Sequence, residues 1–289
     1  MDFLEKMEDN SDWQVIAHTS QKESASELLD LYDDICIEIA SYNQKISNHA
    51  TAIPTSSMLP HKKLLLDFYK NPPSGLDKLI QQRRNKHELV CCPYCGSPFA
   101  PDTLDHFIPK DEWPEFSIHP NNLVPQCDEC APIKGSDYYC ATNNYAFFIH
   151  PVYSDIISRV RFEIEVIFQA GDSAAEFKPK FFAGELSAEE TVRAKNHLKK
   201  LRVRDRITVY CNSEISRLKN LLTENTFDIL VAIEQRIREH EHEGSRAKNW
   251  KTALYKGMKE NKSFIDYLNG LRPQDTTVPN EPEWTEFSF

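Results

Sequence analysis

The chain has 289 residues, of which 40% are hydrophobic and 27% are charged, and its formal net charge is −10. This length allows one large core or two modest ones, and the composition is that of a globular protein. The sequence has no apolar run near the roughly 20 residues that cross a bilayer, so we expect no membrane association. Its start, "MDFLEKMEDNSDW", lacks the basic and apolar regions of a secretory signal, and we therefore expect a cytoplasmic location.

The negative charge is concentrated at one end of the chain. Residues 1–40 hold eleven acidic residues and two lysines, a local charge of −9. Residues 193–206 hold seven basic residues and one acidic residue, and a shorter basic run covers 81–86. Phosphates are bound by local basic patches whatever the total charge is, although each run alone is also typical of a solvated helix face. The residues of the longer run that we predict to contact nucleic acid are Lys199, Lys200 and Arg202.

The N-terminal third has the pattern of a helical region. Apolar residues recur at helical spacing from Leu28 to Ile46, which predicts a helix over 24–47 with Ser24 as its cap. Two shorter helices are expected near 60–70 and 75–88, because the breaker "NPPSG" lies between them.

The C-terminal half combines a hairpin with further helices. Residues 159–168, "RVRFEIEVIF", alternate apolar and charged side chains, which predicts a strand with one exposed face and a partner strand in 176–184. From Ser187 to about Leu271 the pattern predicts three or four helices. The stretch that follows contains three prolines and no period, so we expect a tail or a docking segment.

Two Cys-x-x-Cys pairs, Cys92/Cys95 and Cys127/Cys130, are separated by 31 residues. Paired cysteines in a reducing compartment are more typical of metal sites than of disulfides, and four thiolates suit tetrahedral zinc. A redox pair would instead place one such motif beside a strand–helix unit, and incidental cysteines are a third reading. We predict a closed and therefore structural zinc site, for which the adjacent Cys91 is a less favourable ligand. The cysteines expected to be small buried residues are Cys36, Cys140 and Cys211.

Within the loop between the cysteine pairs lies "TLDHFIPK", with Asp105 and His106 as neighbours. Neighbouring side chains on a strand point to opposite faces, so a twist or bulge is needed to bring both to one metal ion. A carboxylate can ligate a hard cation such as Mg²⁺, and a neutral imidazole can take a proton from water. Phosphodiester hydrolysis requires these two functions, although an isolated Asp-His pair is weak support for them.

The order Cys-x-x-Cys, Leu-Asp-His-x-x-Pro-Lys, Asn-Leu-Val-Pro, Cys-x-x-Cys and x-x-x-Lys-Gly resembles the zinc-bound HNH endonucleases, a branch of the ββα-metal nucleases. The resemblance covers about 45 residues, and its motifs are specific in order and spacing. It implies a hairpin and a helix around one catalytic divalent metal ion, Mg²⁺ or Mn²⁺. By position it makes His106 the general base and Asp105 a metal ligand. It makes Asn122, or its neighbour Asn121, the residue that braces the loop, and it places Lys134 near the start of the helix in contact with phosphate.

One position departs from the family pattern. The residue directly after the last cysteine, normally a His or Asn that completes the metal site, is here Ala131, which has no donor atom. Either another side chain supplies the ligand or the site is impaired, by natural change or by an engineered substitution. We favour the loss of the ligand. The nearby residues that offer a replacement are Asp128, Glu129, Asp137 and His119.

These observations predict an α+β fold, a mainly helical chain with a central zinc-stapled HNH module and a small β-hairpin. We divide the chain into an acidic helical region (1–88), the HNH module (89–150), a β-hairpin with a helical region (151–273) and a tail (274–289).

The predicted function is metal-dependent hydrolysis of nucleic acid, with double-stranded DNA as the expected substrate and with activity weakened at Ala131. The layout also resembles HNH effectors of bacterial phage defence, including the PtuB-like type, which implies a protein partner such as an ATPase or a sensor subunit. The alternative is a catalytically silent, zinc-stapled module that binds DNA or protein.

Overall fold

The computed structural model of the protein describes residues 1–7, 13–224, 227–239 and 246–273. The tail predicted for 274–289 lies outside the described residues. Within them the chain is mainly helical, and its strands form three two-stranded antiparallel sheets. This architecture, together with the clustering of the four predicted zinc cysteines, confirms the predicted α+β fold class.

The N-terminal region is helical, as predicted, but the helix expected over 24–47 is divided into three. The helices of this region are α1 (Trp13–His18), α2 (Ala25–Asp30), α3 (Tyr32–Ala40), α4 (Tyr42–Ser47), η1 (Leu59–His61), α5 (Lys62–Lys70) and α6 (Ser74–Asn85). The breaks fall at Leu31 and Ser41. The Ser41 hydroxyl donates a hydrogen bond to the Glu38 carbonyl at 2.7 Å, a local bond that competes with the helical ladder. Ser24 precedes α2, but its side chain makes no capping hydrogen bond.

The central module is built of short elements joined by turns. They are β1 (Thr103–His106), η2 (Pro114–Phe116), η3 (Pro120–Asn122), β2 (Leu123–Gln126), α7 (Cys130–Lys134), β3 (Tyr139–Cys140) and β4 (Tyr145–Ala146). β1 pairs with β2 and β3 pairs with β4, both antiparallel. The hairpin and helix implied by the family resemblance are therefore β1, β2 and α7.

The C-terminal half begins with the predicted hairpin. Its elements are η4 (Ile157–Arg159), β5 (Val160–Ile167), β6 (Glu176–Ala183), α8 (Ala188–Lys200), α9 (Val203–Glu224), α10 (Ile229–Arg238), α11 (Trp250–Glu260) and α12 (Lys262–Asn269). The described residues form five helices here, more than the three or four predicted. Arg202 adopts a left-handed φ of 52° between α8 and α9, and Asn261 ends α11 and caps α12. In the described part of the chain, none of the helices is both long and apolar enough to cross a membrane.

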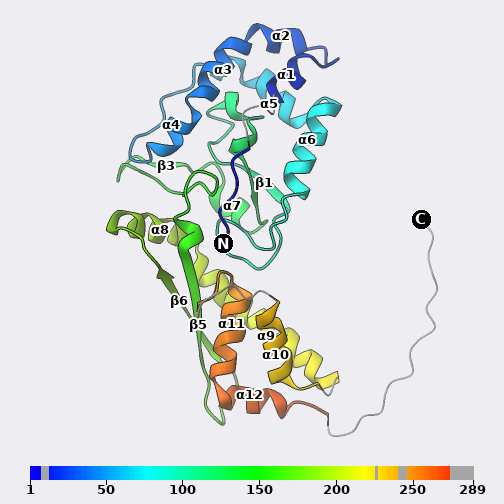
Figure 1. The fold of residues 1–289 in the computed structure, drawn as a ribbon, viewed down its shortest axis with the longest axis vertical. Helices are drawn as coiled ribbons and strands as arrows, with labels where there is room; N and C mark the ends of the chain where they lie inside the picture. Colours follow the sequence, from blue (N-terminus) through cyan, green and yellow to red (C-terminus); the bar gives the residue numbers. More distant parts are fainter. Residues whose placement is uncertain (8–12, 225–226, 240–245, 274–289) are drawn as a thin grey trace, which may run out of the picture.

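Figure 1 shows the arrangement of these elements in two parts. The N-terminal helices surround the central module at one end, and the β5–β6 hairpin lies with α9 to α12 at the other. One large core joins them, because buried residues of the central module such as Tyr94 belong to the same cluster as Phe162 of β5 and Trp250 of α11. A second cluster lies among the N-terminal helices and reaches Leu123 of β2.

The contact between β5 and α11 depends on a glycine. Gly257 faces the backbone of β5, and a Cβ atom at this position would lie 1.9 Å from the carbonyl oxygen of Ile164. The alternating pattern of β5 buries Phe162, Ile164 and Val166 against this side of the structure. The absence of a side chain therefore lets the helix approach the strand closely.

We predict that Gly257→Ala lowers the free energy of unfolding by about 3 kcal/mol, because backbone and not a flexible side chain must move to make room. The measurement is chemical denaturation followed by circular dichroism. The matched control is Gly184→Ala, since a Cβ atom at Gly184 meets nothing within 4 Å. Equal stability of the two variants would contradict the close approach.

Candidate functional site

The site is organised by the β1–β2 hairpin and the helix that follows it. In the hairpin, Asp105 lies opposite Val124 and His106 lies opposite Leu123. The hydroxyl of Thr103 donates to the Gln126 carbonyl at 2.7 Å, which fastens the open end of the pair. Asp105 and His106 are the last two residues of β1, so they lie at the end of the hairpin opposite Thr103 and Gln126.

The four predicted zinc cysteines converge. The sulfur atoms of Cys92, Cys95, Cys127 and Cys130 all lie within 4.8 Å of one another and are buried. The Cys95 and Cys127 sulfurs are 3.8 Å apart. Sulfurs bound to zinc at about 2.3 Å in a tetrahedron lie about 3.8 Å apart, so this set of donors fits a zinc ion. Cys91 is also buried but does not belong to the group.

Two tight turns aim these sulfurs at one point. In the first, the Gly96 amide donates to the Cys92 carbonyl at 2.9 Å, and Gly96 has a φ of 76°, in the left-handed region that favours glycine. In the second, the Cys130 amide donates to the Cys127 carbonyl at 3.0 Å. The Cys-x-x-Cys spacing is thus realised as two knuckles, one before β1 and one between β2 and α7.

An arginine outside the motif, Arg206, contacts the sulfurs of this cluster. The Arg206 guanidinium donates to the sulfurs of Cys130 at 3.2 Å, Cys127 at 3.5 Å and Cys95 at 3.6 Å. It also pairs with the Glu129 carboxylate at 2.8 Å. Four thiolates around a divalent ion carry a net charge of −2, and a guanidinium beside them offsets part of it. In the sequence, Arg206 belongs to the basic run of 193–206, and nothing there distinguishes it as a contact of the cysteines. The spacing of the cysteine motifs carries no information about α9.

The other cysteines differ in part from the prediction. Cys211 is fully buried in α9, as predicted. Cys36 and Cys140 are only half-buried, because Cys36 faces a pocket between α1 and α3 and Cys140 lies in the short strand β3.

We predict that Cys92→Ser abolishes stoichiometric zinc and lowers the free energy of unfolding by several kcal/mol, since three thiolates hold the ion poorly. Elemental analysis and thermal unfolding of the same preparation provide the two measurements. The neighbouring variant Cys91→Ser should keep one zinc per chain. Zinc loss in both variants, or in neither, would contradict the assignment of the four ligands.

Asn122 braces the loop that follows the Asp-His pair. Its side-chain oxygen accepts hydrogen bonds from the Ile108 amide at 2.7 Å and from the Tyr42 hydroxyl at 2.9 Å. Its side-chain nitrogen donates to the carbonyls of Ile108 at 3.1 Å and Phe116 at 3.0 Å. Of the two asparagines considered from the sequence, Asn122 therefore has the bracing geometry. The neighbouring Asn121 instead pairs with the backbone of Met7.

The imidazole of His106 is held in the protein interior. Its Nε2 lies 2.9 Å from the carbonyl oxygen of Ser117, and the ring of Tyr69 from α5 contacts it edge-on with centroids 4.4 Å apart. Burial lowers the pKa of His106 to about 3, and the positive charge of Lys110 acts in the same direction. The imidazole is therefore neutral at physiological pH. With a carbonyl as its neighbour, Nε2 carries the proton, and Nδ1 keeps its lone pair.

The carboxylate of Asp105 faces away from His106, toward α7. One oxygen accepts a hydrogen bond from the Tyr94 hydroxyl at 2.7 Å, and the other pairs with the Lys134 ammonium at 3.0 Å. Both members of the ion pair are almost inaccessible, with side-chain exposures of 0% for Lys134 and 8% for Asp105. The Lys134 ammonium also donates to the carbonyls of His106 and Phe107. A cation and a phenol thus already satisfy Asp105.

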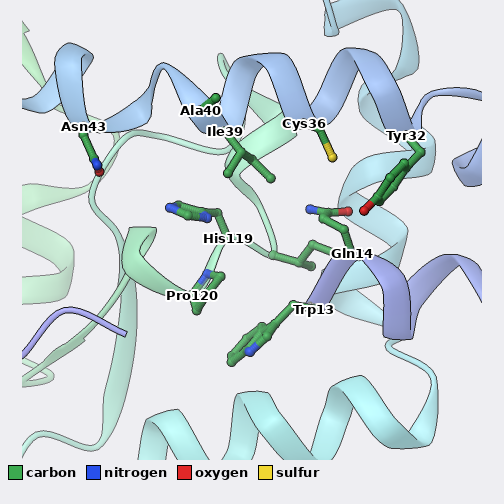
Figure 2. Close-up of a pocket in the computed structure, with 10 residues that line it drawn as sticks. Trp13, Gln14, Tyr32, Cys36, Ile39, Ala40, Asn43, His119 and Pro120 are labelled. Atoms are coloured by element: carbon green, nitrogen blue, oxygen red, sulfur yellow. The ribbon is translucent and has the colours of Figure 1, made fainter. Parts of the chain in front are cut away.

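The other predicted ligands do not gather at Asp105. Among the described residues, the four cysteines are the only cluster of three or more His, Cys, Asp or Glu side chains. Asp128 is exposed, Glu129 pairs with Arg206, and Asp137 pairs with Lys200 at 2.6 Å. His119 packs against Tyr42 with ring centroids 4.7 Å apart. His119 also lines a pocket of about 260 Å³. Figure 2 shows its side chain facing side chains of α3 and α4.

The arrangement therefore does not fit a complete divalent-metal site. Ala131 lies in the first turn of α7 and offers no donor, and Asp105 and His106 contact different parts of the protein. A hydrolytic metal site needs several protein donors around one ion, and here one carboxylate is in place.

The residues predicted to contact nucleic acid lie in different surroundings. Lys134 is the last residue of α7, not near its start, and its side chain is buried. Lys200 turns toward the central module, where it pairs with Asp137 and lies 4.2 Å from the ring centroid of Phe147. Lys199 and Arg202 flank the α8–α9 turn and line a pocket there.

Four partners of these residues were not predicted from the sequence. They are Tyr42 on Asn122, Tyr69 and the Ser117 carbonyl on His106, and Tyr94 on Asp105. Tyr94 lies inside the first Cys-x-x-Cys motif, and a tyrosine in a zinc knuckle directed at the following strand was the one available hint.

Residues 92–137 match the family model of HNH endonuclease, which confirms the resemblance for the segment that holds both knuckles, the hairpin and α7. Over 128 residues the chain is 29% identical to Protein ea31 of Escherichia phage lambda. That similarity covers 44% of this chain and 43% of the phage protein, so the chain spans less than half the length of this curated relative. No solved structure matches the chain.

Proposed function

We propose that this protein acts on nucleic acid through its HNH endonuclease segment and that its hydrolytic site is impaired. The observation that carries the proposal is the combination of a braced Asp-His hairpin with Ala131 at the first turn of α7. The proposed reaction is hydrolysis of phosphodiester bonds, with double-stranded DNA as the substrate and with Mg²⁺ or Mn²⁺ as the required ion.

The proposed general base is His106. The Ser117 carbonyl fixes the imidazole through Nε2, which leaves Nδ1 as the atom that would take a proton from the attacking water. Asn122 supports the position of His106 indirectly, because its side chain forms hydrogen bonds with both the amide and the carbonyl of Ile108. The ring of Tyr69 covers one edge of the imidazole, so α5 would have to yield for substrate to approach.

The proposed impairment of hydrolysis follows from the groups that surround Asp105. A divalent ion would supply positive charge to the phosphate and to the leaving oxygen. Asp105 would have to release the Lys134 ammonium to hold such an ion, and Ala131 gives no second ligand. We therefore propose that the protein turns over its substrate slowly.

The alternative function is a catalytically silent module that binds nucleic acid or protein. The ion pair between Asp105 and Lys134 favours it, because an ammonium already provides the counter-charge that a metal ion would bring. A role in phage defence and a partner such as an ATPase or a sensor subunit are expectations from the resemblance alone.

The test is cleavage of supercoiled plasmid by the zinc-loaded protein in Mg²⁺ or Mn²⁺. We expect slow nicking by the protein itself and a gain of about 100-fold in Ala131→Asn, because an added metal ligand acts directly on the transition state. The gain should disappear in the double variant with His106→Ala, which has no base for water.

The matched control is Ala174→Asn, which adds the same side chain to an exposed loop. If the unaltered protein cleaves as fast as Ala131→Asn, the proposed impairment is wrong. If Ala131→Asn binds nucleic acid but never cleaves it, the silent module is the better account.

A further inference from the structure

The turn between α8 and α9 closes one side of a pocket. Arg202 has a left-handed φ in this turn, and Phe181 of β6 also lines the pocket. The pocket is open to solvent and has a volume of about 510 Å³, large enough for a nucleoside. Buried side chains of Leu198 and Val203 contribute an apolar surface.

The pocket carries uncompensated positive charge. Its lining includes four cations, Lys195, Lys199, Arg202 and Arg204, and one acid, Asp205. Within the described residues, Arg202 is the only one of these four cations that forms an ion pair. Its partner Asp205 is 3.8 Å away, and both side chains are about 70% exposed. Such an exposed pair contributes little, so the pocket retains an excess of positive charge for an anionic ligand.

The basic run of 193–206 thus serves three separate purposes. Lys200 joins α8 to Asp137 of the central module. Arg206 contacts the zinc cysteines. The remaining cations of the turn, exemplified by Lys199, face the pocket. The basic residues of this run therefore do not form one continuous surface patch. Those without an acidic or cysteine partner at the α8–α9 turn line the pocket.

An aromatic ring and a guanidinium add a stacking surface to this charge. Arg204 lies 5.5 Å from the ring centroid of Phe181, and Phe181 is only partly buried. Flat groups of this kind accept a nucleobase, whereas the surrounding cations accept phosphate. Free phosphate would contact only the cations and would leave the apolar part of the pocket unoccupied.

We infer that the α8–α9 pocket binds an unpaired nucleotide of a nucleic-acid strand, with its base at Phe181 and Arg204 and its phosphates at Lys195, Lys199 and Arg202. This inference rests on the proposed function for the class of ligand, nucleic acid, and adds to the double-stranded substrate proposed there a separate site for a nucleotide that is unpaired. A base within a duplex is stacked on both faces and cannot enter.

The pocket adjoins the HNH segment through α9. Arg202 precedes α9, and Arg206 is one turn further along, a rise of about 6 Å. Arg206 contacts Cys130, the residue that begins α7 and precedes Ala131. The pocket therefore lies within about one helical turn of the arginine that contacts the zinc cysteines.

The experiment measures binding and not cleavage, so it is independent of whether the protein hydrolyses its substrate. Zinc-loaded protein is titrated against a fluorescent single-stranded DNA 20-mer and against its duplex, without added Mg²⁺ or Mn²⁺, by anisotropy at several salt concentrations. We expect Lys199→Gln to weaken single-strand binding several-fold and to reduce the salt slope by about 0.7. The neighbouring variant Lys200→Gln should change neither.

The stacking component has its own pair of variants. Phe181→Leu should weaken single-strand binding about tenfold and duplex binding much less, while Phe182→Leu on the same strand should have no such effect. Zinc content and melting temperature establish that each variant is folded. Equal losses for single strand and duplex, or no loss in Phe181→Leu and Lys199→Gln, would overturn the inference.

Discussion

The four-cysteine cluster and the guanidinium of Arg206 hold the functional part of this molecule together. The cluster joins one knuckle before β1 to a second between β2 and α7, so it fixes the end of the hairpin at which β1 begins and β2 ends. Arg206 then ties α9 to the same sulfurs, and the Trp250 indole donates to the Cys95 carbonyl at 2.8 Å. The buried residues of the central module thereby form one continuous core with those of the C-terminal half.

A second set of contacts sets the geometry at the other end of the hairpin. Tyr42 of α4 donates to Asn122, and Asn122 holds the loop directly after His106. All of these groups are buried, and buried polar groups are stable only when they are paired. The acidic N-terminal helices therefore act as a support for the Asp-His hairpin, and Tyr69 of α5 also covers the imidazole.

Much of this could be predicted from local pattern. The spacing within each Cys-x-x-Cys pair predicted the four clustered cysteines, and alternation in residues 159–168 predicted β5, because each of these patterns is local in the sequence. The breaks at Leu31 and Ser41 were missed, since the apolar period continues through them. The pairing of Asp105 with Lys134 and of Lys200 with Asp137 joins residues that are far apart in the chain, and no spacing rule reports such contacts.

We propose that the four-cysteine scaffold of this protein carries an incomplete catalytic metal site. Titration of zinc-loaded protein with Mn²⁺, followed by electron paramagnetic resonance, tests it most directly because free and bound Mn²⁺ give different signals. We expect only weak Mn²⁺ binding and no tight site, since Asp105 is paired with Lys134 and Ala131 offers no ligand. One equivalent of tightly bound Mn²⁺ that is lost in Asp105→Asn would contradict it.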